Sequence, residues 1–172
     1  MWEYSLTAAE EALAVQVGYK RQARFFGKPE KNMNYSEGDL WETWQHAVCA
    51  GSELAFARML GWSDFIPHYD EFKMLEDLPQ FGEIRYTFNY SRGLRFTNRD
   101  DVNKRYVLIV EGLAKRTRRT APDYLSHPYK AIGWAFGHEC MNNEWRYNET
   151  TWYVPLDNLN SMESLTYAQS AS

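Results

Sequence analysis

Four charged side chains in the middle of the sequence have the types and spacing that phosphodiester chemistry requires: Glu53, Asp77, Glu83 and Arg85. Glu83 and Arg85 lie two residues apart in an extended segment, so they share one strand face while Ile84 turns toward the core. Carboxylate oxygens are the ligands that Mg²⁺ prefers, and a water on such a cation can attack a phosphodiester. A cation near the carboxylates can stabilise charge on the phosphate. The pattern predicts that the three carboxylates converge on one divalent cation.

Each of these side chains also has an ordinary structural alternative. Glu53 can be a surface carboxylate on a helix, and Glu83 can be a solvated strand residue paired with Arg85. Three nearby acidic residues compete with Asp77 for its role: Asp64, Asp70 and Glu76. The sequence leaves these alternatives open.

Histidines and cysteines offer two further candidates for a site. His46 shares one predicted helical face with Glu42 and Glu53, although a hydrogen-bonded structural histidine is the more common role. The segment 138–140 reads His-Glu-Cys, but adjacent strand residues point to opposite faces, and no second His/Cys pair lies at zinc spacing. We therefore expect no structural zinc.

Two helices and a set of strands must position the charged residues. Thr7 and Glu10 have capping-box spacing ahead of a helix predicted from residue 8 to about residue 25. A second helix is predicted from Asp39 to Leu60, because Gly61 is a typical residue at a helix end. The predicted strands are 83–90, 94–96, 106–110, 131–137 and 151–154.

The order of the elements, helices first and then mostly strands, predicts an α+β fold with a mixed central sheet flanked by the N-terminal helices. We expect strands 83–90 and 106–110 to be neighbours in that sheet, with the helix 40–60 packed against it. The length of 172 residues fits one domain, predicted over 1–165, with a flexible tail over 166–172.

Composition excludes several classes of protein. Hydrophobic residues make up 44% of the chain, which is typical of a folded protein, and no segment has the length and apolar character of a membrane span. The first residues lack the basic and apolar regions of a secretory signal, and Cys49 and Cys140 cannot build a disulfide scaffold. We expect a cytoplasmic protein with no membrane partner.

Positive charge is unevenly placed although the net charge is −4. The densest basic group is a candidate phosphate-contacting segment: Lys115, Arg116, Arg118 and Arg119. Most aromatic residues are expected in the core, while Trp62 or Tyr90 can stack on bases.

The arrangement resembles the PD-(D/E)XK nuclease superfamily, which has the restriction-endonuclease-like fold. The short gap between Asp77 and Glu83 is similar to that of the mismatch-repair nicking endonuclease and its restriction-enzyme relatives. The wider layout also resembles small uncharacterised phage and metagenomic members. Besides Asp77, the matching pieces are 53–55 (Glu-Leu-Ala), 83–85 (Glu-Ile-Arg), 106–110 (Tyr-Val-Leu-Ile-Val), 133–134 (Gly-Trp) and 153–155 (Tyr-Val-Pro).

The resemblance covers about residues 40–160 and implies a site at the same four residues. Glu53, Asp77 and Glu83 would bind Mg²⁺ or Mn²⁺, and Arg85 would lie at the scissile phosphate. Two features depart from the family: Arg85 replaces the usual lysine, and no proline precedes Asp77. Arginine keeps the charge but presents a planar fork in place of a compact ammonium.

Two functions from different classes follow. The first is a Mg²⁺-dependent nuclease, or a nuclease-like nucleic-acid-binding protein, of phage type and located in the host cytoplasm. The alternative is a catalytically inactive relative that binds and inhibits or regulates a host protein. The sequence does not decide whether the substrate is DNA or RNA. It also does not decide whether the protein forms a homo-oligomer, or which protein it binds.

Overall fold

A computed structural model describes residues 2–23, 39–69, 76–79, 81–87, 93–111 and 125–169 of the chain. Within these ranges the side chains of 39–43, 111 and 166–169 are not described. The predicted basic segment 115–119 lies outside the described residues, as do Asp70 and Tyr90.

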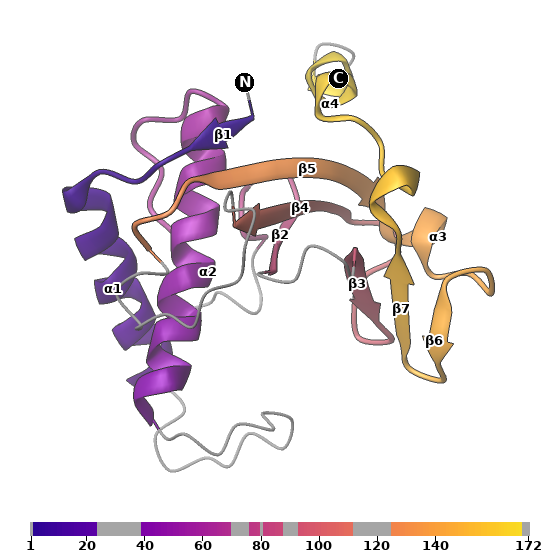
Figure 1. Cartoon of the computed structure of the whole chain (residues 1–172), viewed down its shortest axis with the longest axis horizontal. Coiled ribbons are helices and arrows are strands. Elements are labelled where there is room, and N and C mark those ends of the chain that lie inside the picture. Colours follow the sequence, from indigo (N-terminus) through magenta and orange to yellow (C-terminus); the bar gives the residue numbers. More distant parts are fainter. Residues whose placement is uncertain are drawn as a thin grey trace.

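Two antiparallel helices form the N-terminal part of the molecule (Figure 1). Helix α1 covers Ala8–Ala23 and helix α2 covers Asp39–Met59, close to the predicted bounds. The capping box is confirmed, since the Glu10 N–H donates to Thr7 Oγ1 and the Thr7 N–H donates to Glu10 Oε2. Gly61 follows α2 with φ of +81°, a conformation that glycine adopts without strain.

The larger sheet has four strands in the order β1–β5–β4–β2. Their bounds are Glu3–Tyr4 for β1, Tyr129–Phe136 for β5, Arg105–Glu111 for β4 and Glu83–Thr87 for β2. β2 runs parallel to β4, while β4 and β5 are antiparallel, so the predicted mixed sheet is confirmed. The predicted neighbours 83–90 and 106–110 are paired over the described part of the first segment.

A second, smaller sheet holds β3, Leu94–Thr97, against β7, Thr151–Val154, and β6, Arg146–Asn148. Thus β3 does not continue the sheet of β2, and its partner β7 lies far along the chain. The remaining elements are α3 (Gly137–Cys140), the short 3₁₀ helix η3 (Leu156–Asn158) and α4 (Met162–Gln169). Helix α4 continues into residues 166–169, which the sequence alone placed in a tail.

Strand β4 separates two hydrophobic cores. Val107 and Ile109 pack into the core shared with the helices, whereas Tyr106, Leu108 and Val110 pack into the core shared with the small sheet. Successive strand residues point to opposite faces, so a strand buried on both faces must be apolar throughout. This explains the continuous apolar run at 106–110. The layers are therefore helices, large sheet and small sheet, as Figure 1 shows.

Small residues bring α1 and α2 close together. A Cβ atom added to Gly18 would lie 2.6 Å from the backbone nitrogen of Ala47, so a larger side chain there would force the helices apart. Gly51 of α2 packs against Tyr129 of β5 in the same way, because a Cβ atom added to Gly51 would lie 2.5 Å from the phenol oxygen. The close approach of α1 and α2 at Gly18 brings Arg21, one turn later on α1, within reach of Glu53 on α2.

The part of the chain that the structure describes contains no helix with the length and apolar character of a membrane span.

Candidate functional site

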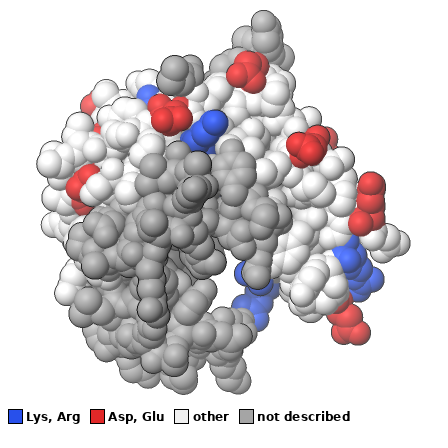
Figure 2. Space-filling model, in the orientation of Figure 1, with Lys and Arg blue, Asp and Glu red and all other residues white. Residues whose placement is uncertain are grey.

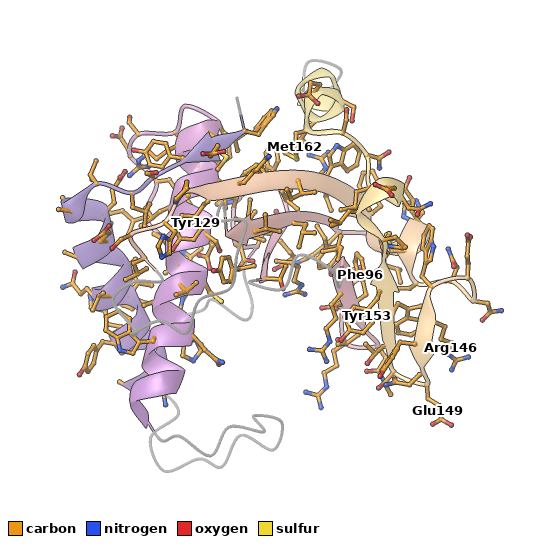
Figure 3. All side chains as sticks on the ribbon, viewed as in Figure 1. Phe96, Tyr129, Arg146, Glu149, Tyr153 and Met162 are labelled. Atoms are coloured by element: carbon orange, nitrogen blue, oxygen red, sulfur yellow. The ribbon has the colours of Figure 1, made fainter. Side chains whose placement is uncertain are left out.

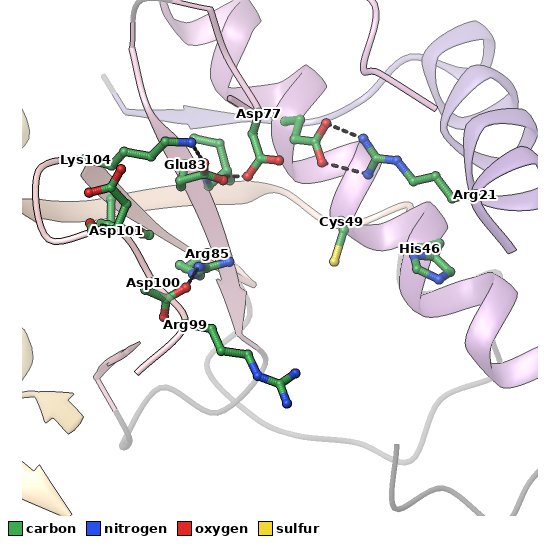
Figure 4. A pocket seen from close by; sticks show the side chains of 13 residues that line it. Arg21, His46, Cys49, Asp77, Glu83, Arg85, Arg99, Asp100, Asp101 and Lys104 are labelled. Carbon is green, nitrogen blue, oxygen red and sulfur yellow. Dashed lines mark hydrogen bonds and ion pairs between the residues drawn. The ribbon is translucent and has the colours of Figure 1, made fainter. Parts of the chain in front are cut away.

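A pocket of about 430 Å³ lies between α2, β2 and the turn that leads from β3 to β4 (Figure 4). Five carboxylates line it: Glu53, Asp77, Glu83, Asp100 and Asp101. Four Lys and Arg side chains line it with them: Arg21, Arg85, Arg99 and Lys104. The pocket therefore gathers all four residues that the sequence analysis selected.

Glu53 lies at the helical side of the pocket and is almost completely buried, with 3% of its surface exposed. Its carboxylate accepts two hydrogen bonds from the Arg21 guanidinium, both at 2.8 Å, in a bidentate ion pair. Arg21 is held in turn by a bond from Nε to the carbonyl oxygen of His68. Burial raises the pKa of Glu53, although Arg21 opposes the shift. Glu53 is thus a buried, paired carboxylate, which excludes the surface alternative.

Asp77 lies between Glu83 and the Arg21 side of the pocket (Figure 4). One of its oxygens accepts the backbone N–H of Ile84 at 2.8 Å, which fixes the carboxyl at the start of β2. No ion pair among the described residues includes Asp77. Burial and the negative charges of Glu53 and Glu83 raise its pKa well above the usual value. The three carboxylates therefore interact, and among the described residues Asp77 is the one of the three that forms no ion pair.

Glu83 forms an ion pair with Lys104. The alternative from the sequence, in which Glu83 pairs with Arg85, is therefore wrong. Lys104 Nζ lies 2.6 Å from Glu83 Oε1, across the gap between β2 and the residue before β4. Burial is the largest single influence and disfavours the charged ammonium, but the hydrogen bond and charge of Glu83, with the charges of Glu76 and Asp101, together raise the pKa of Lys104. Sequence analysis missed Lys104, although it directly precedes the apolar run of β4.

Arg85 forms its ion pair with Asp100, which also accepts the backbone N–H of Thr97. Its guanidinium lies 5.1 Å from the ring centre of Tyr106, within the range of a cation–π contact. Glu83 and Arg85 therefore do share a face that opens on the pocket, and Ile84 is buried in the core. Arg85 is placed at the pocket, but its partner there is an aspartate that the sequence analysis did not name.

Two further α2 residues, His46 and Cys49, complete the helical wall of the pocket (Figure 4). With Glu53 they occupy one face of the helix, as the spacing of His46 and Glu53 predicts. The Cys49 thiol is exposed, and the surrounding protein, followed by the charge of Glu53, raises its pKa.

The other candidates lie elsewhere. Asp64 is exposed after α2, and neither it nor Glu76 lines the pocket. Residues 138–140 form a short helix instead of the end of a strand. There Glu139 accepts the N–H of Phe136 while Cys140 is buried in the core of the small sheet. Trp62 is partly buried and packs edge-on against Phe81 at the border of the core.

The donor types fit a hard divalent cation, since three interacting carboxylates line one pocket and one of them, Asp77, forms no ion pair among the described residues. The carboxylates are not arranged as a metal centre in this structure. Across the described ranges, no three His, Cys, Asp or Glu side chains are grouped closely enough to hold a metal ion. Binding a cation would require Glu83 to exchange Lys104 for the metal.

Comparison with known proteins gives no relative: no family model, no curated protein and no solved structure matches the chain.

Proposed function

We propose that the protein is a metal-dependent nuclease with a restriction-endonuclease-like core, and that the pocket is its active site. The observation that carries the proposal is the convergence of Glu53, Asp77 and Glu83, with Arg85 and Lys104 beside them, in one pocket. These residues come from helix α2, the segment before β2, strand β2 and the turn before β4. Burial and the negative charges of Glu53 and Glu83 raise the pKa of Asp77, and a bound cation would offset this repulsion.

In this proposal Asp77 and Glu83 hold Mg²⁺ or Mn²⁺, and Glu53 contributes through the field of its charge or through water. The cation would supply an activated water and would stabilise charge on the phosphate. Asp77 must lose its proton for this, so the raised pKa of its carboxyl couples cation binding to proton release.

Two cations of the chain itself can contact the phosphate. Lys104 would be released from Glu83 as that carboxylate turns to the metal, which leaves a compact ammonium beside the reacting group. Arg85 is partly exposed and can offer its planar fork to two phosphate oxygens. The chain would thus replace the usual lysine of the family by an arginine on β2 and a lysine next to β4.

A second candidate is a catalytically inactive protein of the same fold that binds a host protein. The Arg21–Glu53 pair favours it, because a carboxylate held by two 2.8 Å bonds in a buried site is not free to become a metal ligand. In that case the ion pairs of the pocket would be structural.

Cleavage assays separate the two candidates. The protein is incubated with labelled single- and double-stranded DNA and RNA in Mg²⁺, Mn²⁺ or EDTA. We expect metal-dependent cleavage of at least one substrate, and a loss of about 100-fold or more in Asp77→Asn and Glu83→Gln. Asp64→Asn is the matched control, since it removes an exposed carboxylate outside the pocket. Lack of cleavage for every substrate and metal would favour the binding protein.

A further inference from the structure

The small sheet has one face in the core and one open face. Leu94 and Phe96 of β3 are buried, whereas Arg95 between them is exposed. Arg95 pairs in register with Tyr153 of β7, and directly paired residues of antiparallel strands lie on the same face. Tyr147 of β6 joins them, since its ring lies 5.4 Å from that of Tyr153 at an angle of 89°. We call Arg95, Tyr147 and Tyr153 the open face.

The side chains of the open face are available to a ligand. Tyr147 is 74% exposed, which is high for an aromatic ring on a folded domain. Among the described residues, no hydrogen bond or ion pair holds the Arg95 guanidinium or either tyrosine hydroxyl. Arg146, the other arginine of this sheet, is different, because its guanidinium donates to the carbonyl oxygens of Asn148 and Glu149.

Strand β3 of the open face leads along the chain into the turn that lines the candidate active site. β3 ends at Thr97, and the next residues, Arg99, Asp100, Asp101 and Lys104, line the pocket. A polymer that lies along β3 would therefore be led toward the carboxylates. In Figure 3 Tyr153 lies beside β3, while Arg146 lies farther out along β6.

We propose that the open face binds a single-stranded stretch of nucleic acid, with a base stacked on Tyr147 and a phosphate held by Arg95. Stacking on a protein ring requires a base that is free of its neighbours, which a single strand offers and a duplex does not. The free guanidinium matches the phosphate by charge. This inference rests on the proposed function, because it names the form of the substrate for that site.

On the face that Figure 2 shows, the described Lys and Arg side chains are scattered among acidic ones and form no continuous stripe. Binding of a duplex over a broad basic surface gains no support from these residues. A short contact that combines one cation with aromatic stacking suits a single strand better.

The test measures binding without cleavage. Fluorescence anisotropy in EDTA follows the binding of a labelled oligonucleotide of about 15 nucleotides, single-stranded or as a duplex. We expect the single strand to bind more tightly, and Tyr147→Ala and Arg95→Gln each to raise its Kd about 5- to 100-fold. Arg95→Gln should also lower the slope of log Kd against log salt by about 0.7.

Control variants remove an exposed ring and an exposed charge from surfaces outside this sheet. Tyr19→Ala removes an exposed ring from α1, and Lys130→Gln removes an exposed charge from β5. Both should bind as the parent does, and all four variants should keep the melting temperature. The inference is overturned if the parent does not bind the single strand, if the open-face variants bind as the parent does, or if the controls lose as much. Metal-dependent cleavage is scored separately with the parent protein, so a failed inference does not count against the nuclease.

Discussion

The two sides of the pocket hold their charges in different ways. On the helical side, the Arg21 and Glu53 side chains are 3% and 4% exposed and meet in a bidentate pair. On the strand side, Arg85 is 36% exposed and Lys104 is 28% exposed, each with one carboxylate partner. A buried charge has no water to replace a lost partner, whereas a half-solvated one does. The difference indicates that the Arg21–Glu53 ion pair is fixed, whereas the ion pairs of Arg85 and Lys104 can exchange partners.

The largest expected effect is a loss of stability when the ion pair on the helical side is broken. Arg21→Met leaves the Glu53 charge buried without its partner, and we expect it to lower the free energy of unfolding by about 3–5 kcal/mol. Denaturant unfolding measures the change. The double variant Arg21→Met with Glu53→Leu should recover most of the loss, because it removes both charges. A loss below about 1 kcal/mol in Arg21→Met would show that the helical pair is as exchangeable as the strand pairs.

The next effect is on turnover and comes from the strand side. Arg85→Ala and Lys104→Met should each reduce cleavage by about 100-fold, while the free energy of unfolding changes by about 1 kcal/mol or less, because both pairs are partly solvated. Rates are measured under single-turnover conditions and stability by denaturant unfolding. If both variants mainly lose stability, Arg85 and Lys104 are structural residues. The proposed difference between the helical side and the strand side is then wrong.

Arg85→Lys sharpens this result, since lysine is the usual residue at this position in the nuclease family that the sequence resembles. A rate equal to or above the parent's would show that either cation serves the site. Activity gained by Arg85→Lys in an otherwise inert parent would identify a silenced nuclease whose role is binding. A rate as low as that of Arg85→Ala would show that the planar fork itself is required.

The smallest effect concerns Asp77 and its dependence on pH. Its folded-state pKa is raised, so the native state holds a proton that the unfolded chain releases, and stability falls as pH rises from the unfolded value through the raised folded value. Asp77→Asn keeps an oxygen for the Ile84 N–H and carries no charge. We expect this variant to be more stable than the parent above that range and to show a flatter pH profile of unfolding. A profile identical to the parent's would contradict a raised pKa.

Local patterns in the sequence were enough to predict the elements. The capping box of Thr7 and Glu10 depends on neighbouring residues, and the run 106–110 must be apolar because both of its faces are covered. Both predictions are confirmed. The pairing of β3 with β7 was not foreseen, since it depends on packing between segments that are distant in the chain. Nothing in the residues 94–97 themselves selects one sheet over the other.

The composition of the site was predicted only in part for the same reason. Glu53, Asp77, Glu83 and Arg85 were found from spacing, but their partners lie 32 residues away for Glu53 and 21 for Glu83. A signal for Arg21 was present, because it falls on the buried face of α1 with Ala14, Val17 and Gly18 at helical spacing. An arginine on an apolar face requires a buried acid, and Glu53 supplies it.

The most direct test of the central claim is a calorimetric titration of Mn²⁺ into the parent protein and into Asp77→Asn, in buffers of different ionisation enthalpy. We predict one bound cation per chain in the parent, with release of a proton as the Asp77 carboxyl ionises, and loss of that binding in Asp77→Asn. Asp64→Asn should bind as the parent does. Absence of binding to the parent, or equal binding to Asp77→Asn, would contradict a metal site in this pocket.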